Sequence, residues 1–246
     1  MKKKRVVFTQ GGKGGVGKTT LANDLADWYR RKKIPVKFLD FDIENKKSSG
    51  FAFFNEGTEK FNIREENSFL EIMNILDDDE YEVMLIDQGA ASSQETFQWF
   101  STFGEDAREM GIVFTSIGLI TGDPGSLESV FEWASVLQDN TDYLIVKNKM
   151  ASPQEDFAAW EADPRVKKIL GQYNVEEVVM GVKNPDFEKM MRTIGMTAGQ
   201  ATTVTKGELT KSKWQVLIRG YNRACDRMFD PVSDLLLPLE ADEAVE

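Results

Sequence analysis

The sequence predicts an α/β fold: a single domain with a mostly parallel central sheet flanked by helices on both faces. Two observations lead to this prediction. Short apolar stretches of strand length alternate with longer amphipathic stretches of helical period, as in successive βαβ units. A glycine-rich loop joins the first apolar stretch to the first helical one, and acidic residues follow directly on two of the other apolar stretches.

Each element is predicted from its own stretch of sequence. A helix over residues 19–32 carries apolar side chains on one face and ends before Pro35. Apolar residues at helical spacing predict a last helix over 214–229, which Pro231 closes. We expect the domain to cover residues 1–230 and an acidic tail to cover 231–246. The predicted strands cover residues 6–9, 36–39, 83–86, 112–116, 143–146 and 175–180.

Composition excludes several kinds of chemistry. The 246 residues carry 30 Lys and Arg against 41 Asp and Glu, a net charge of −11, so an anionic partner must be held by a local basic region. The absence of histidine removes the commonest general base and metal ligand, and the single cysteine, Cys225, excludes an internal disulfide. No uncharged stretch approaches the roughly 18 residues of a membrane span. We therefore expect a soluble, cytoplasmic protein.

The loop "TQGGKGGVGKTTL", residues 9–21, contains the phosphate-binding pattern GxxxxGK[ST]. Backbone N–H groups of such a loop converge at a helix N-terminus, where the helix dipole also favours an anion. Lys18 would reach the terminal phosphates and the Thr19 hydroxyl would hold Mg²⁺, while the glycines allow a close backbone approach. The predicted nucleotide-binding residues of this loop are Gly12, Gly14, Gly15, Val16, Gly17, Lys18, Thr19 and Thr20.

Carboxylates at the ends of two other strands complete a candidate magnesium and water site. Asp87 follows the apolar stretch of "VMLIDQG", and Asp40 and Asp42 follow that of "VKFLDFDIEN". Mg²⁺ and an attacking water both need such anchors. Because Asp40 and Asp42 are two positions apart, both would leave an extended strand on the same face. The alternative for all three is a solvated strand end.

The segment "KGGVGKTT" resembles the deviant Walker A motif of the ParA/MinD family of P-loop ATPases. The resemblance implies a P-loop NTPase fold, ATP as the nucleotide, and a face-to-face, ATP-dependent homodimer that hydrolyses ATP slowly. It also implies separate roles for the two lysines of the loop. Lys18 would serve the phosphates of its own subunit, and Lys13 would reach across the interface to the nucleotide of the partner. A solvated loop lysine is the alternative for Lys13.

Further motifs extend this resemblance. It implies that Asp42 positions the attacking water, that Asp87 supports the metal together with Thr19 and Asp42, and that Asn148 contacts adenine. A motif that reads guanine would need aspartate where this chain has Ala151, so ATP is favoured over GTP. The chain has "DQGAA" where typical members read DxPAG. That variant, with "LITGDPGSLES" after it, resembles the TraL and StbB branch, which is encoded with plasmid conjugation and stability functions.

Candidate partners come from the C-terminal part of the chain. Residues 206–229 hold six basic side chains against two acidic ones, and Arg219, Arg223 and Arg227 are spaced four apart on one helical stripe. The resemblance implies DNA binding without sequence preference; a solvated helix face is the alternative. The acidic C-terminus lacks the basic amphipathic helix of membrane-positioning members, so no membrane insertion is expected. The candidate DNA contacts are Lys211, Lys213, Arg219, Arg223 and Arg227.

These observations favour a dimerising ATPase switch for plasmid or DNA segregation, stability or conjugative transfer, whose hydrolysis a protein adaptor stimulates. Three alternatives remain open: an ATPase that positions a protein cargo, an ATP-dependent metabolic ligase or synthetase, and a module that binds ATP without hydrolysing it. The aromatic stretch at 97–103 is interpreted as core rather than as a partner groove.

Overall fold

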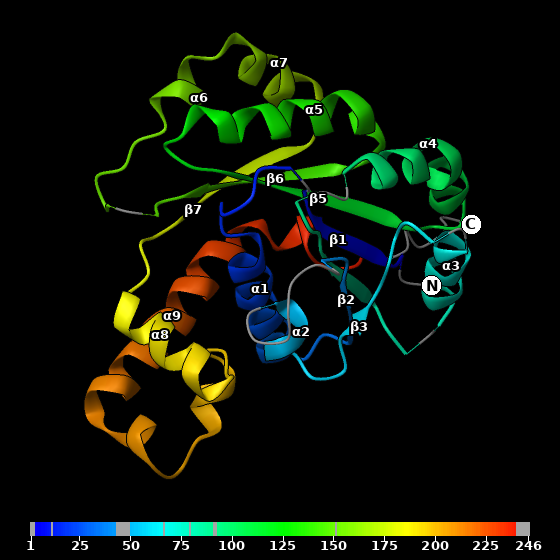
Figure 1. The fold of residues 1–246 in the computed structure, drawn as a ribbon. Coiled ribbons are helices and arrows are strands. Elements are labelled where there is room, and N and C mark those ends of the chain that lie inside the picture. Colours follow the sequence, from blue (N-terminus) through cyan, green and yellow to red (C-terminus); the bar gives the residue numbers. More distant parts are fainter. Residues whose placement is uncertain are drawn as a thin grey trace, which may run out of the picture.

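The computed structural model describes residues 3–10, 12–42, 50–65, 67–78, 80–90, 93–150 and 152–239. Within these residues a seven-stranded sheet has the order β3-β2-β4-β1-β5-β6-β7, and all of its paired strands are parallel (Figure 1). The predicted parallel α/β fold is therefore confirmed. The strands are β1 (Arg5–Thr9), β2 (Val36–Asp40), β3 (Glu59–Lys60), β4 (Val83–Asp87), β5 (Val113–Ile120), β6 (Asp142–Asn148) and β7 (Val175–Met180).

Helices cover both faces of the sheet (Figure 1). One apolar cluster joins the sheet to α3–α7, and a second joins it to α1, α2 and α9. Successive side chains of a strand point to opposite faces of the sheet, so one strand can contribute to both clusters. In β1, Val6 and Phe8 belong to the first cluster and Val7 belongs to the second. The helices are α1 (Lys18–Lys32), α2 (Phe51–Phe54), α3 (Ser68–Leu76), α4 (Ser93–Glu109), α5 (Leu127–Leu137), α6 (Ala158–Ala162), α7 (Pro164–Gln172), α8 (Pro185–Ile194) and α9 (Ser212–Phe229).

Local sequence explains where the helices begin and end. Helix α1 ends at Lys33, which adopts a left-handed conformation with φ 58° and donates its N–H to the carbonyl of Arg30. Helix α8 begins at Asn184, whose side chain accepts the N–H of Phe187, and Pro185 occupies the first turn. These are signals that the sequence displays directly, so the predicted helix at 19–32 lies within one residue of the observed α1.

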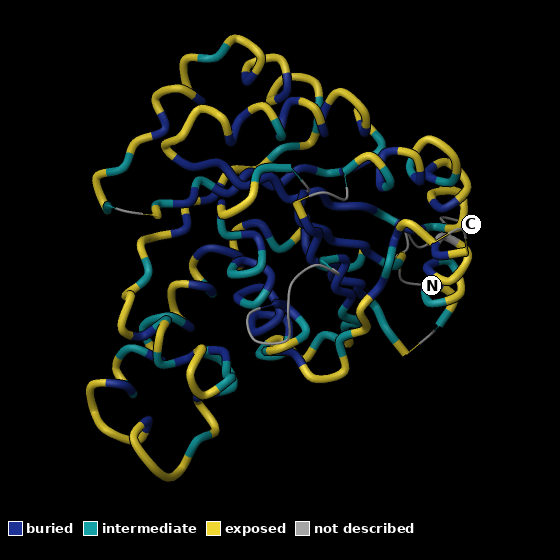
Figure 2. The backbone as a smooth tube through the Cα atoms, in the orientation of Figure 1, coloured by how far each residue is buried: buried dark blue, intermediate teal, exposed yellow. Residues whose placement is uncertain are grey.

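Most strand residues are buried, whereas the outward-facing residues of the helices are exposed (Figure 2). Within the predicted aromatic core segment, Phe97 and Trp99 are buried in the cluster under α3–α7, which confirms that interpretation. Strand β3 was not predicted. It has only two residues, both polar and exposed, and it pairs at the edge of the sheet with the end of β2.

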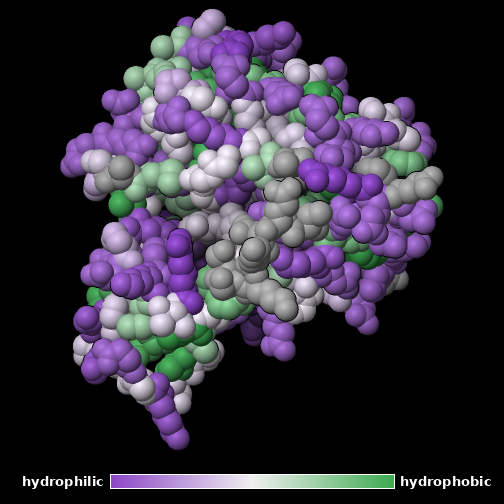
Figure 3. Space-filling model, viewed as in Figure 1, coloured by the Kyte–Doolittle hydropathy of each residue, from purple (hydrophilic) through white to green (hydrophobic). Residues whose placement is uncertain are grey.

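Helix α8 and the first half of α9 form a lobe, residues 184–221, beside α1 at the lower left of Figure 1. The lobe has a small apolar core of its own, built around Phe187 and Trp214. Its face in Figure 3 mixes hydrophilic and hydrophobic side chains.

Polar side chains of α1 hold the lobe and the segments that flank it. Asp24 accepts two hydrogen bonds from Lys183, at 2.6 and 2.7 Å. One turn later, Asp27 accepts the Thr197 hydroxyl and the N–H of Gly199, both at 2.6 Å. Burial raises the pKa of the Asp27 carboxyl, and these hydrogen bonds partly offset that effect.

The chain after α9 packs against the body of the domain. Val232, Leu235 and Leu236 are buried, and the buried Arg5 guanidinium donates to the carbonyls of Leu235 and Leu237 at 3.1 and 2.7 Å. Apolar residues beyond the predicted boundary at 230 therefore pack against the domain as far as Leu236. The sequence placed that boundary at the helix break, whereas the apolar side chains beyond the break pack against the core. The rest of the predicted acidic tail, residues 240–246, lies outside the described residues.

Among the described residues, no helix combines the length and the apolar character that crossing a membrane requires.

Candidate nucleotide site

The candidate site lies where β1, β4 and β2 end, at the loop that opens into α1. A cavity of about 410 Å³ is lined there by the loop residues Gly14, Gly15, Gly17, Lys18 and Thr19. Thr20 and Asp42 also line it, and residues of α8 form part of its wall. The predicted loop residues are thus brought to one cavity, except for Gly12, Lys13 and Val16, which do not line it.

Two glycines are required by the shape of the loop. Gly17 has φ 100°, and a Cβ there would lie 2.6 Å from the side-chain amide of Asn148. Gly12 has φ 111°, and a Cβ there would lie 2.3 Å from the Ser129 hydroxyl. Any other residue would meet both a strained backbone and a steric clash at these positions. The motif glycines therefore serve packing beneath the loop as well as approach to a phosphate.

Lys18 is enclosed by the loop, with 9% of the residue exposed. Its ammonium group donates to the backbone carbonyl of Lys13 at 2.9 Å. Burial lowers the pKa of Lys18, and the negative charges of Asp87 and Asp42 partly counteract this effect. A buried cation of this kind is stabilised by an anion placed beside it, as a phosphate would be.

Asp87 is a buried carboxylate that two threonine hydroxyls hold in place. It is 1% exposed, and it accepts the hydroxyl of Thr19 at 2.7 Å and that of Thr9 at 3.2 Å. Burial raises the pKa of Asp87 to about 7; the charge of Asp40 adds to this rise, while the two hydroxyls and Lys18 oppose it. A threonine hydroxyl and a carboxylate held together are the oxygen ligands that Mg²⁺ takes beside nucleotide phosphates, so these residues fit that ion.

Asp40 and Asp42 differ in their surroundings. Asp40 is fully buried, and its two oxygens accept the N–H groups of Asp42 at 3.0 Å and Ala52 at 3.2 Å. Its carboxylate thus ties the end of β2 to the start of α2, whereas Asp42 lines the cavity. The remainder of the "LDFDIEN" motif lies in residues 43–49, outside the described residues, as do Ala91 of "DQGAA" and Ala151.

Asn148, at the end of β6, is buried beneath the loop. Its side-chain amide donates to the carbonyl of Val16 at 2.8 Å, so Asn148 supports the loop from below. A contact with adenine stays a prediction from the family resemblance.

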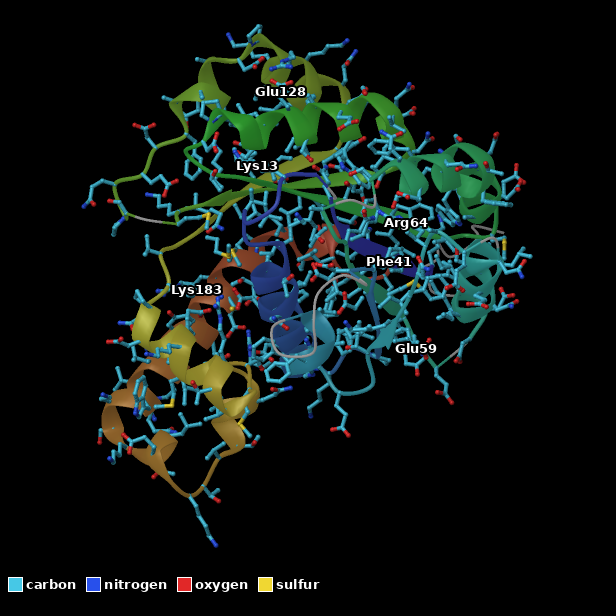
Figure 4. The ribbon with its side chains drawn as sticks, in the orientation of Figure 1. Lys13, Phe41, Glu59, Arg64, Glu128 and Lys183 are labelled. Atoms are coloured by element: carbon cyan, nitrogen blue, oxygen red, sulfur yellow. The ribbon has the colours of Figure 1, made fainter. Side chains whose placement is uncertain are left out.

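Lys13 is directed away from the cavity lining. Its side chain, labelled in Figure 4, is 36% exposed. It forms an ion pair with Asp123, in the loop between β5 and α5. The Lys13 side chain thus lies at the surface.

Several residues of the cavity wall were missed by sequence reasoning. Lys183 and its ion-pair partner Asp24 line the cavity together with Tyr221, and Figure 4 shows Lys183 beside α1. Lys183 and Asp24 lie 159 positions apart, and no local motif links them. The sequence held one signal for this pair: Asp24 is a charged residue on the apolar side of α1, which also carries Leu21, Leu25 and Trp28.

The chain is similar in sequence to a known family and to a curated protein. The profile of the family described as the CobQ/CobB/MinD/ParA nucleotide binding domain matches residues 7–218. A curated relative, Protein MobD of Acidithiobacillus ferrooxidans, is 22% identical over 156 residues, which are 63% of this chain and 67% of that protein.

Solved structures of similar fold cover nearly the whole chain. The septum site-determining protein MinD of Pyrococcus horikoshii, complexed with Mg-ADP, matches with a TM-score of 0.55 and 13% identity, over 91% of this chain and 95% of that one. A putative plasmid partition protein of Borrelia burgdorferi bound to AMPPNP matches with 0.51 and 12%, over 94% and 100%. The MinC:MinD cell division protein complex of Aquifex aeolicus matches with 0.51 and 15%, over 97% and 99%. At these identities, the structural matches show the fold.

Proposed function

Because this chain belongs to the CobQ/CobB/MinD/ParA family of nucleotide-binding domains, we propose that it is a Mg²⁺-dependent ATPase switch that dimerises when it binds ATP. One observation carries the proposal. The Thr19 hydroxyl of the phosphate-binding loop, which lines the cavity together with Lys18, is hydrogen-bonded at 2.7 Å to the buried Asp87 at the end of β4. This arrangement joins a phosphate cradle to a carboxylate, which is the combination that phosphoryl transfer needs.

Each residue then has a distinct task. Lys18 and the loop N–H groups bind the β- and γ-phosphates, and Asp42 orients the water that attacks the γ-phosphate. Thr19 and Asp87, with Asp42 near them, would hold Mg²⁺, which neutralises phosphate charge when it is bound. Lys13 reaches across the dimer interface to the partner's nucleotide, where its positive charge stabilises the negative charge that develops on the transferred phosphoryl group.

The solved relatives support the proposed ligands and the proposed biological role. One relative is bound to AMPPNP and another to Mg-ADP, which supports ATP and Mg²⁺ as the ligands here. The plasmid partition protein supports a role in plasmid or DNA segregation, stability or conjugative transfer. The complex of MinD with MinC supports a protein adaptor as a further partner, one that would stimulate hydrolysis.

Light scattering with and without Mg-ATP tests this proposal. The wild type is expected to be monomeric without nucleotide and dimeric with ATP, and Lys13→Ala is expected to bind ATP but to dimerise poorly. Lys168→Ala, which removes an exposed lysine of α7, is the matched control and should behave as the wild type. A wild type that binds ATP and stays monomeric would contradict the switch and favour a metabolic ligase.

We also propose that α9 binds DNA by contacting the phosphates of the DNA backbone. Arg219, Arg223 and Arg227 are exposed, and within the described part of the chain none of the three forms an ion pair. The two lysines predicted to assist them, Lys211 and Lys213, are exposed as well, although Lys211 pairs with Glu208. Unpaired guanidinium groups four positions apart on one helix can each displace a counterion from a DNA backbone.

The variant Arg219→Ala/Arg223→Ala should weaken DNA binding similarly for unrelated sequences. It should reduce the slope of log K against log salt concentration by up to about 2, since each phosphate contact contributes about 0.9. Fluorescence anisotropy with the ATP-bound protein at several salt concentrations measures this slope. The charge-matched control, Lys167→Ala/Lys168→Ala on α7, should leave the slope unchanged. Equal slopes in all three proteins would rule out this surface.

A further inference from the structure

Lys13 is held by its own subunit. Its ammonium group forms an ion pair with Asp123, which lies 110 positions later in the loop between β5 and α5. Both side chains are at the surface, with 36% of Lys13 and 57% of Asp123 exposed. The lysine that the proposed dimer must extend toward a partner is therefore already bound to a carboxylate in cis.

Hydrogen bonds within its own loop hold Asp123 in place. Its Oδ1 accepts the N–H of Gly125 at 2.8 Å, and its backbone carbonyl accepts the hydroxyl of Ser126, also at 2.8 Å. Its own N–H donates to the hydroxyl of Thr121 at 3.2 Å. The first of these bonds holds the carboxylate through Oδ1, the other two hold the Asp123 backbone, and Oδ2 accepts the Lys13 ammonium. The hydrogen bond from Lys13 is also the main reason why the pKa of Asp123 is lowered.

The loop that carries Asp123 is itself anchored. Glu155 accepts the N–H of Gly122 through one carboxylate oxygen and the N–H of Met150 through the other, both at 2.8 Å. One side chain thus ties the loop after β5 to the end of β6. The loop that carries the acceptor for Lys13 is consequently joined to the segment that follows β6.

We propose that Asp123 is a cis latch, which holds Lys13 in the monomer and must release it before the ATP-bound dimer can form. This inference rests on the proposed function, because the latch opposes the ATP-dependent dimerisation proposed there. Exposed ion pairs contribute little, so each latch changes the equilibrium by up to about fivefold, and the two latches of a symmetric dimer by up to about 25-fold. The latch therefore raises the protein concentration at which ATP produces dimers.

The variant Asp123→Asn tests the latch. It removes the charge but keeps an oxygen for the N–H of Gly125. In sedimentation equilibrium with Mg-ATP, its dimer dissociation constant should be lower than that of the wild type, by up to about 25-fold. Asp156→Asn is the matched control, because Asp156 is also exposed and accepts a backbone N–H two residues later, that of Ala158. In a Lys13→Ala background, Asp123→Asn should have no further effect.

A second measurement does not depend on dimerisation. In the nucleotide-free protein, acetylation of Lys13 by an amine reagent, followed by peptide mass spectrometry, should be several times faster in Asp123→Asn than in the wild type. Acetylation of Lys168 should be equal in both. If the wild type forms no ATP-dependent dimer, the proposed function fails, and the labelling rates still decide whether Asp123 holds Lys13. Unchanged labelling overturns the latch, as does a dimer whose dissociation constant is unchanged or raised in Asp123→Asn.

Discussion

Lys18→Ala is expected to weaken ATP binding by about 100-fold or more. Charge-assisted hydrogen bonds to phosphate contribute roughly 1.5–3 kcal/mol each, and a lysine in this loop can make more than one of them. Its ammonium group lies inside the loop, 2.9 Å from the Lys13 carbonyl, beside the cavity in which phosphates would be bound. Isothermal titration calorimetry with Mg-ATP measures the loss, with Lys168→Ala as the control.

Thermal melting separates a loss of binding from a loss of fold. Burial lowers the pKa of Lys18, so its positive charge costs folding free energy when no phosphate is present. The melting temperature of nucleotide-free Lys18→Ala should therefore be equal to or above that of the wild type, while the increase produced by Mg-ATP should disappear. An equal ATP-induced increase in both proteins would show that Lys18 does not hold the phosphates.

Asp42→Ala is expected to reduce hydrolysis by about 10²–10³-fold, the effect of losing a group that orients or deprotonates the nucleophile. ATP binding should persist, and the dimer should accumulate because hydrolysis no longer ends it. Asp42 lines the cavity, whereas both oxygens of Asp40 are occupied by backbone N–H groups. The sequence placed these two carboxylates together, and the structure assigns only Asp42 to the cavity.

Single-turnover hydrolysis with Mg-ATP, followed in parallel with sedimentation, measures both effects in Asp42→Ala. Asp106→Ala, which changes an exposed aspartate of α4, is the control and should hydrolyse ATP as the wild type does. If Asp42→Ala hydrolyses at the normal rate, or loses ATP binding altogether, the assignment of the water-positioning role to Asp42 is wrong.

Much of the fold was predictable because its signals are local. Strands β1, β2, β4 and β7 match their predicted positions to within one residue. Strand β5 was predicted to end at 116 but continues to Ile120, although Gly118, a residue type that weakens strands, lies within its last part. The two-residue edge strand β3 left no periodic pattern in the sequence, and the periodic apolar residues of the last helix did not reveal that its first half packs with α8 in a separate small core. Their residues are ordered by contacts with distant parts of the chain.

The sequence by itself determined the parallel sheet, the phosphate-binding loop and the strand-end carboxylates Asp42 and Asp87. Each of these depends on neighbours within a few positions, where residue type and spacing are read directly. Only the tertiary structure decided that Asn148 supports the loop at Val16, 132 positions away, and that Asp123 holds Lys13. Such pairs are set by which strand ends adjoin in the sheet. The order of the strands is set only when both apolar faces of the sheet are buried, so no local sequence pattern predicts it.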